Sequence, residues 1–177
     1  MSKNSIKQIE KDEKKILEQL RKNANKSIND IAEKCGFSRQ KVWRYINNLE
    51  KNHTIWGYIT VIDDDKINKE NYIMLIKRTN KPISKKLVDD VINRNVADEV
   101  RENGIDINCS FFTHGTYDWV ICFNANNIRE AKAFVEYFNK LYEGYISDIN
   151  LIEIMFSSVR SGLKNPEIEK LNEFFNV

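Results

Sequence analysis

Residues 27–51, SINDIAEKCGFSRQKVWRYINNLEK, carry the signals of two helices joined by a tight turn. Ser27 precedes an apolar-periodic segment, and its hydroxyl can accept the free amides at a helix N-terminus. Gly36 ends that helix, because the residue after a helix favours a left-handed conformation that glycine adopts at no cost. Ser38 repeats the capping signal for a helix over about 39–52. The apolar residues on one face of that helix are Val42, Ile46 and Leu49.

An amphipathic helix precedes this pair. Apolar residues recur at helical spacing among charged ones and predict a helix over about 9–23; they are Ile9, Ile16, Leu17 and Leu20. The N-terminal part of the chain is therefore predicted to be a winged-type helix-turn-helix domain of three helices.

The outward face of the third helix has no acidic residue; it holds Gln40, Arg44, Asn47, Asn48 and Lys51. Arg and Lys can contact phosphates or guanine, and Gln and Asn carry the donor and acceptor pair that fits adenine. We predict double-stranded DNA as a partner, contacted by Ser38, Arg39, Gln40, Lys41, Trp43, Arg44, Asn47, Asn48 and Lys51. The alternative is an ordinary solvated helix face; the preceding short helix, the glycine turn and the serine cap favour DNA.

The charge of the chain changes sign after the third helix. IWGYITVI at residues 55–62 predicts a strand, which the acidic run 63–65 ends. Residues 1–62 carry 13 Lys and Arg against 7 Asp and Glu, net +6, whereas residues 63–177 carry 15 against 19, net −4. This division suits a basic DNA reader joined to an acidic scaffold.

The acidic part repeats one pattern twice. The predicted elements are strand 72–78, helix 83–95 and strand 107–113, then strand 117–124, helix 127–142 and strand 148–156. This βαββαβ order predicts an α+β chain whose C-terminal domain is a ferredoxin-like antiparallel sheet with two helices on one face. We expect a helix-turn-helix domain over 1–54, a linking strand and hinge over 55–69, the ferredoxin-like domain over 70–157 and a tail with a short helix over 158–177.

Composition limits the classes of protein that remain. The chain has 177 residues, of which 31% are charged, its mean hydropathy is −0.56, and it has neither an 18-residue apolar run nor a signal peptide. We expect a cytoplasmic protein with no membrane partner. The three cysteines, Cys35, Cys109 and Cys122, are too few and too widely spaced for a disulfide framework and are interpreted as small buried apolar residues.

An ordered set of matches runs through the first 63 residues: Ile9-Glu10, Glu13, Ile16-Leu17, Asn23-Ala24, Ser27, Ile31-Ala32, Gly36, Ser38, Val42, Ile46, Leu49-Glu50, Ile55, Gly57-Tyr58 and Asp63. In these positions the chain resembles the leucine-responsive regulatory protein and asparagine regulator (Lrp/AsnC) family of transcription regulators. Residues 70–157 are similar to the family's effector domain, so the resemblance covers about 150 residues. It implies a sequence-specific DNA-binding regulator. Two departures are Tyr45, where the family has Arg, and Asn52-His53, where the family ends the recognition helix with Gly.

The resemblance also implies partners. Gly115-Thr116-Tyr117-Asp118 matches a family motif near an effector pocket formed between subunits, and a carboxylate there can bind the ammonium group of an amino acid. The candidate effector residues are Ser110, Thr113, His114, Gly115, Tyr117 and Asp118. The alternative is that Gly115 and Asp118 are ordinary turn residues. The family forms dimers that assemble into octamers; a homodimer also follows from the small footprint of a single helix in one groove. We expect its contacts to use Trp56, Tyr58, Trp119, Ile121 and Phe123.

Catalytic motifs are missing from the sequence. The two histidines fall in different predicted domains, and no HExxH, GxSxG or CxxC spacing occurs. We therefore expect no enzymatic activity, metal or cofactor. The alternative is a relative of the same fold such as a siroheme decarboxylase, but only His114 and Arg101 are available to hold a tetrapyrrole's carboxylates.

Overall fold

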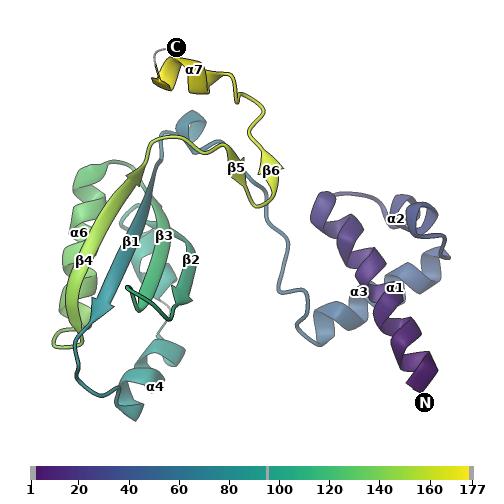
Figure 1. Ribbon diagram of the computed structural model, residues 1–177, viewed down its shortest axis with the longest axis horizontal. Coiled ribbons are helices and arrows are strands. Elements are labelled where there is room, and N and C mark those ends of the chain that lie inside the picture. Colours follow the sequence, from purple (N-terminus) through teal and green to yellow (C-terminus); the bar gives the residue numbers. More distant parts are fainter. Residues whose placement is uncertain (1–2, 95, 176–177) are drawn as a thin grey trace. The chain divides into compact units, whose positions relative to one another are not determined.

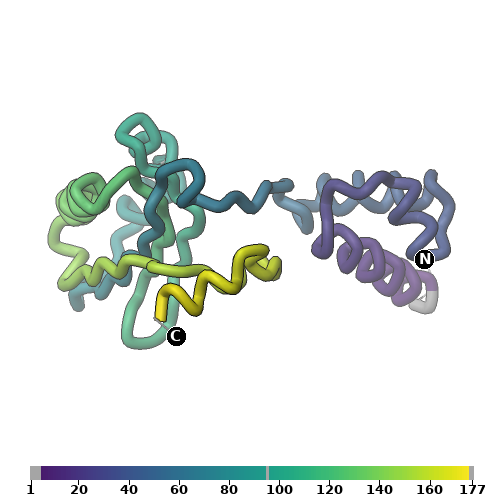
Figure 2. Tube along the Cα trace, turned by 90° about the horizontal axis from the view of Figure 1, so that it is seen from above, coloured from purple at the N-terminus to yellow at the C-terminus, as the bar shows by residue number. Residues whose placement is uncertain are grey.

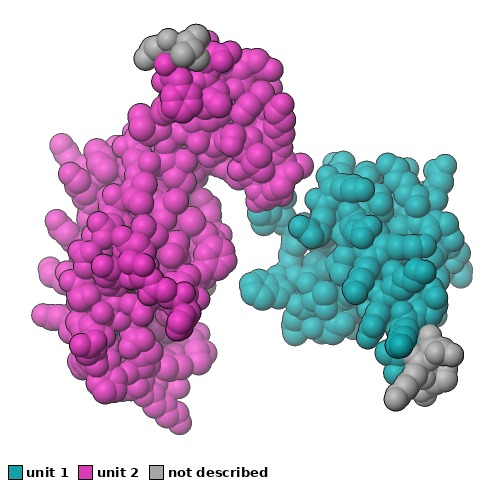
Figure 3. Space-filling view, in the orientation of Figure 1, with its two compact units in different colours: residues 1–61 teal, residues 62–177 magenta. Residues whose placement is uncertain are grey.

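The computed structural model describes residues 3–94 and 96–175 (Figure 1). Figure 2 follows the chain from the N-terminal helices through an irregular segment into a sheet with helices. The chain forms two compact units, residues 1–61 and 62–177 (Figure 3). The finer division predicted from the sequence, with a separate hinge and tail, stays a prediction.

Unit 1 consists of α1 (Lys3–Lys22), α2 (Ile28–Cys35) and α3 (Arg39–Lys51). Each helix contacts the other two. Their apolar faces meet in one core, made by Ile16, Ile31, Ala32, Cys35, Val42 and Tyr45. The predicted three-helix arrangement is confirmed, with α1 beginning earlier than expected.

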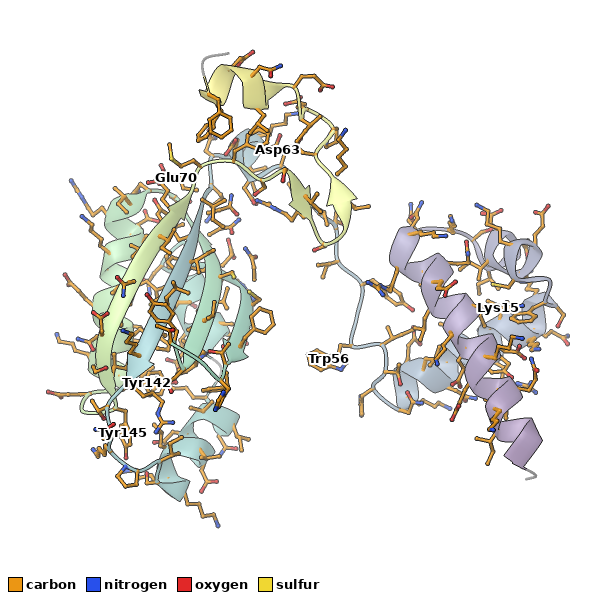
Figure 4. The ribbon with its side chains drawn as sticks, viewed as in Figure 1. Lys15, Trp56, Asp63, Glu70, Tyr142 and Tyr145 are labelled. Atoms are coloured by element: carbon orange, nitrogen blue, oxygen red, sulfur yellow. The ribbon has the colours of Figure 1, made fainter. Side chains whose placement is uncertain are left out.

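The predicted strand at 55–62 is wrong. Residues 56–62 form no regular structure, and Trp56 is 95% exposed (Figure 4). A strand needs a partner for its backbone groups, and no strand occurs among the described residues of unit 1. The segment is instead tied to α3: the Ile55 amide donates to the Leu49 carbonyl at 3.0 Å, and the Tyr58 hydroxyl donates to Glu50 at 2.9 Å.

Unit 2 begins with a short 3-10 helix, η1 (Asp64–Ile67). It then forms β1 (Glu70–Arg78), α4 (Lys85–Asn93), α5 (Val96–Arg101), β2 (Asp106–Phe112), β3 (Trp119–Ala125), α6 (Ile128–Leu141) and β4 (Ile146–Ile154). The strands form one antiparallel sheet in the order β2-β3-β1-β4, which confirms the ferredoxin-like arrangement. The predicted helix 83–95 corresponds to α4, and its residue 95 lies outside the described residues; α5 follows as a further short helix that the sequence did not predict.

The helices cover one face of the sheet, where α6 runs behind the strands in Figure 1. The core of this face is aromatic and aliphatic: Tyr72, Met74, Ile76, Trp119, Ile121 and Phe123 pack against Phe134 and Phe138 of α6. The prediction that Trp119, Ile121 and Phe123 supply an open contact surface is therefore wrong. Both alternating sets of β3 are apolar, so alternation alone does not decide the buried face, and the bulkier aromatic set lies under the helices.

The opposite face of the sheet is also apolar. Paired residues of antiparallel strands point to the same side, and the register places Ile73, Leu75, Cys109, Phe111, Val120, Cys122, Ile152 and Ile154 together. We call this set the open face, because no helix in the described part of the chain packs on it. Cys35 is buried as expected, whereas Cys109 and Cys122 lie partly exposed on the open face, which corrects the interpretation of all three as buried.

The C-terminal segment forms a two-stranded ribbon, β5 (Val159–Arg160) with β6 (Leu163–Lys164), and a short helix, α7 (Lys170–Phe175). The Arg160 guanidinium pairs with the buried Asp64 carboxylate and donates to Asn71 Oδ1 at 3.0 Å. Lys66 Nζ lies 2.8 Å from Glu167 Oε1. These polar contacts hold the segment after β4 against the start of unit 2.

Candidate nucleic-acid interface

The turn between α2 and α3 is built by two serine caps and a glycine. Ser27 Oγ accepts the Asp30 amide at 3.1 Å while the Asp30 carboxylate accepts the Ser27 amide at 3.2 Å, a reciprocal capping box. Gly36 has φ 69°, and the Phe37 amide donates to the Ala32 carbonyl at 2.9 Å. Ser38 Oγ then accepts the Lys41 amide at 3.3 Å. Local sequence therefore sets the direction in which α3 leaves α2.

One side of α3 is held in the core of unit 1. Val42 and Leu49 are buried as predicted, and Tyr45, at 7% exposure, completes the buried side while Ile46 is only partly buried. The position at which the Lrp/AsnC resemblance expects Arg therefore supplies a core aromatic ring here. The Arg44 guanidinium lies 5.7 Å from the centre of that ring.

The exposed side of α3 presents the polar groups predicted for DNA. Arg39, Gln40, Arg44, Asn48 and Lys51 are exposed, and Asn47 is partly exposed. Within the described part of the chain, none of the cations among them has an acidic partner. Trp43 is 58% exposed on the same helix, an unusual position for a large aromatic ring. The exposed side of α3 thus carries polar and cationic side chains together with the indole ring of Trp43.

Lys41 differs from its neighbours. Its ammonium lies 2.7 Å from the Asp12 carboxylate of α1 and 4.0 Å from the centre of the Phe37 ring. Asp12 is buried, and the Lys41 hydrogen bond holds the pKa of Asp12 below its ordinary value although burial acts in the opposite direction. Lys41 thus joins α3 to α1, and a part for it in DNA binding stays a prediction.

Sequence reasoning overlooked Asp12, although a signal was present. Asp12 falls on the apolar side of α1 with Ile9 and Ile16. An acid among apolar residues at helical spacing indicates a buried carboxylate, which needs a cation or hydrogen-bond donors nearby. Lys41 and Gln8 supply them.

The predicted effector residues lie on and around the β2–β3 hairpin. Ser110 Oγ accepts the Trp119 indole N–H at 2.7 Å, and the Thr113 hydroxyl donates to the Tyr117 carbonyl at 2.6 Å. Asp118 Oδ2 accepts the backbone amide of Arg78 at 2.8 Å. His114 and Gly115 are exposed. The structure brings these residues into one loop region but engages Ser110, Thr113 and Asp118 in bonds within the hairpin and to β1.

Comparisons with known proteins agree with this architecture. Residues 13–55 match the family model of winged helix-turn-helix DNA-binding domains. An AsnC family transcriptional regulator from Agrobacterium tumefaciens has TM-score 0.63 and 20% identity over 88% of this chain and 96% of that chain. The leucine response regulatory protein of Mycobacterium tuberculosis has TM-score 0.66 and 13% identity over 88% and 98% of the two chains. The chain has the Lrp/AsnC fold.

One structure of similar fold contains a bound amino acid. A transcriptional regulator from Neisseria meningitidis, solved as a complex with L-Met, has TM-score 0.62 and 17% identity over 93% of this chain and 97% of that one. No curated protein sequence matches the chain. At these identities the structures establish the Lrp/AsnC fold, and the family model establishes the DNA-binding domain.

The C-terminal end of α3, where the chain has Asn52-His53 in place of glycine, places one non-glycine residue in a strained conformation. Asn52 has φ −90°, and His53 takes the left-handed conformation with φ 58°. A side chain in that conformation costs about 1–2 kcal/mol relative to glycine. The chain leaves α3 through the same kind of turn that a glycine would allow.

The residues available to the alternative enzyme lie apart. Arg101 ends α5, shortly before β2 begins, and its guanidinium lies 3.0 Å from the Asp98 carboxylate. His114 comes after the other end of β2. Among the described residues there is no group of three or more His, Cys, Asp or Glu side chains able to hold a metal. No helix in the described ranges is long and apolar enough to span a membrane.

Proposed function

We propose that the chain is a sequence-specific DNA-binding transcription regulator of the Lrp/AsnC type, and that the exposed side of α3 enters the major groove. The observation that carries the proposal is the acid-free exposed face of α3, presented by a capped helix-turn-helix in the segment that matches DNA-binding domains. The net charge of +6 over residues 1–62 supports attraction to phosphates.

The chemistry of the α3 face favours base contacts as well as phosphate contacts. Gln40 and Asn48 can pair with adenine, and Arg44 can donate two hydrogen bonds to guanine. Arg39 and Gln40 stand in the first turn, where recognition helices meet base edges. Lys51, in the last turn, is placed for a phosphate.

The proposal includes a homodimer formed through the open face. One helix-turn-helix contacts a single half-site, and two copies related by a two-fold axis contact two half-sites about one helical turn or a multiple of it apart. The open face is largely apolar, although the register also places Asn150 on it opposite Leu75, and its Phe111 and Ile152 are exposed. In a two-fold dimer the open face of one copy packs against the open face of the other, so apolar residues meet apolar residues. Assembly of such dimers into octamers is part of the same proposal.

Selection from a pool of random duplexes tests the proposal. The full-length protein is expected to enrich one sequence with two related half-sites. Gln40→Ala is expected to relax the base preference at one position in each half-site, while Lys7→Ala, an exposed cation on α1, leaves the enriched sequence unchanged. Absence of any enriched sequence would overturn sequence-specific regulation.

We also propose that an amino acid modulates the regulator by binding near Ser110, Thr113, His114, Gly115, Tyr117 and Asp118. Support comes from the L-Met complex of the Neisseria meningitidis regulator of the same fold and from the partly exposed Asp118 in the same hairpin as the exposed Gly115. Calorimetry of the full-length protein against the twenty amino acids should give heat with at least one of them. Asp118→Asn should weaken the binding of that amino acid, whereas Asp148→Asn, which changes an exposed residue of β4, should not. No heat with any amino acid would contradict the effector proposal.

A further inference from the structure

Two cysteines face each other across the β2–β3 hairpin. In the register of these antiparallel strands, Cys109 of β2 is the partner of Cys122 of β3. The pair lies on the open face, where Cys122 is also the partner of Ile73 in β1. The sequence placed the two cysteines, thirteen positions apart, in neighbouring strands, but only the register of the hairpin shows that they face each other.

The backbone geometry of this pair is compatible with a disulfide. Directly opposed residues of antiparallel strands have Cα atoms about 4.5–5.5 Å apart. Disulfides bridge Cα separations of about 4.4–6.8 Å. The register shifts between Ile107 and Cys109, so an irregularity of β2 lies directly beside the pair and gives its backbone room to adjust.

The surroundings of Cys122 disfavour its thiolate. Burial, and then the hydrogen bond and charge of Cys109, raise the pKa of Cys122 to about 12. Both side chains are partly exposed in the single chain, so a small disulfide in solution can reach them while the open face is not paired with a second copy. Cys35, by contrast, is buried in the core of unit 1.

We propose that Cys109 and Cys122 form a reversible cross-strand disulfide by exchange with a low-molecular-weight disulfide such as glutathione disulfide. The inference does not depend on DNA binding, and it applies to the chain whose open face is not paired with a second copy. The Cys109 thiolate attacks one sulfur of glutathione disulfide, and the first glutathione leaves as a thiolate, which takes up a proton. Cys122 then loses its proton to solvent and attacks the Cys109 sulfur, and the second glutathione leaves. Two protein thiols are oxidised, and one glutathione disulfide is reduced to two glutathiones.

The order of attack follows from the interaction between the two thiols. While Cys109 is free, its charge and hydrogen bond favour the protonated form of Cys122. Once Cys109 is joined to glutathione it carries no charge, and that contribution to the raised pKa is removed. Exposed or strained disulfides have more oxidising potentials and are the reversible ones. The pair is therefore placed to respond to the ratio of disulfide to thiol around the protein.

The test uses dilute full-length protein incubated with mixtures of reduced and oxidised glutathione, followed by blocking of free thiols and mass spectrometry. We expect the wild-type protein to lose two hydrogens and to yield one peptide pair joined through Cys109 and Cys122. Excess reduced glutathione should restore both thiols. Cys35→Ser should behave as wild type, and Cys122→Ser should stop at a mixed disulfide of Cys109 with one glutathione. Cys109→Ser should form no protein disulfide and should react with glutathione disulfide more slowly than Cys122→Ser, because burial still raises the pKa of Cys122.

A comparison with the unfolded chain separates the fold's contribution from mere proximity in sequence. In urea, the effective concentration of the two thiols should fall by at least about tenfold, because the hairpin no longer holds them opposite each other. The proposal is overturned if the folded wild-type protein remains reduced, if it accumulates two glutathione adducts, or if the disulfide forms as readily in urea as in the folded chain.

Discussion

Lys41 and Arg44 stand three positions apart on α3 and make different contacts. The Lys41 ammonium is held by the buried Asp12 at 2.7 Å, whereas Arg44 projects from the exposed side beside the Tyr45 ring. Two cations with the same sequence signature thus differ: Lys41 is paired with a buried acid, and Arg44 is exposed. Sequence periodicity locates both on the helix, but only the packing of α1 against α3 distinguishes them.

Asp12→Asn should lower the free energy of unfolding of unit 1 by about 1–3 kcal/mol, because a charge-assisted pair with a buried acceptor is lost. Hydrogen exchange of the α2 amides reports on unit 1 separately from unit 2. Glu10→Gln, an exposed acid on the same helix, is the control and should change that free energy by less than about 0.5 kcal/mol. Equal effects of the two substitutions would show that the pair with Lys41 contributes nothing.

The same pair predicts a pH dependence. The pKa of Asp12 is lower in the folded chain than in the unfolded chain, so its contribution is complete above the ordinary aspartate pKa of about 4. It is lost as the pH falls through the lowered value. The difference in unfolding free energy between wild type and Asp12→Asn should therefore be largest at neutral pH and shrink in acid. A difference that grew on acidification would contradict the pairing.

At the scale of the element, the capping residues predicted the bounds of α2 and α3 correctly, whereas the composition of residues 55–62 predicted a strand that does not form. Capping is local, so Ser27, Gly36 and Ser38 indicate the same boundaries in the sequence and in the structure. A strand depends on a partner, and β-branched and aromatic residues cannot supply one. The same limit explains the misplaced open face: β3 is apolar on both sides, and only its packing under α6 shows which side is buried.

Gly36→Ala should destabilise unit 1 by about 1–2 kcal/mol, because an L side chain is strained at φ 69° even though the site has open space. Gly57→Ala is the matched control, since Gly57 also has open space and does not have a positive φ. Thermal unfolding followed by circular dichroism at the helix band should show a lower midpoint for Gly36→Ala alone. A loss of similar size at both glycines would remove the link between the left-handed turn and the helix-turn-helix.

For the whole molecule, the sequence predicted the βαββαβ order of unit 2 and the separation of charge, but not which apolar face of the sheet remains uncovered. The ferredoxin-like order follows from alternating strand and helix patterns, and the net charges of +6 and −4 follow from counting. Which apolar face remains uncovered depends on the register of four strands and on helix packing. The open face, with Ile152 and Phe111 exposed on it, is therefore a result of the structure.

Ile152→Glu tests the proposed dimer. A charge on the open face should shift the full-length protein from dimer to monomer in analytical ultracentrifugation and weaken its binding to a two-half-site duplex by at least about tenfold, because burying an unpaired charge is unfavourable. Ile128→Glu is the control: Ile128 is 42% exposed, close to the 44% of Ile152, but lies at the start of α6. A dimer that survives Ile152→Glu, or one that is lost equally in both variants, would argue against the open face as the interface.

The most direct test of the proposed function is the affinity of wild type and Arg44→Ala for two labelled duplexes, the sequence selected from the random pool and a scrambled version of it, measured by fluorescence anisotropy at one salt concentration. If Arg44 reads a base, the variant should lose about 1–3 kcal/mol on the selected duplex and little on the scrambled one. Lys7→Ala should leave the ratio of the two affinities unchanged. An equal loss on both duplexes, or no loss on either, would contradict sequence reading by α3.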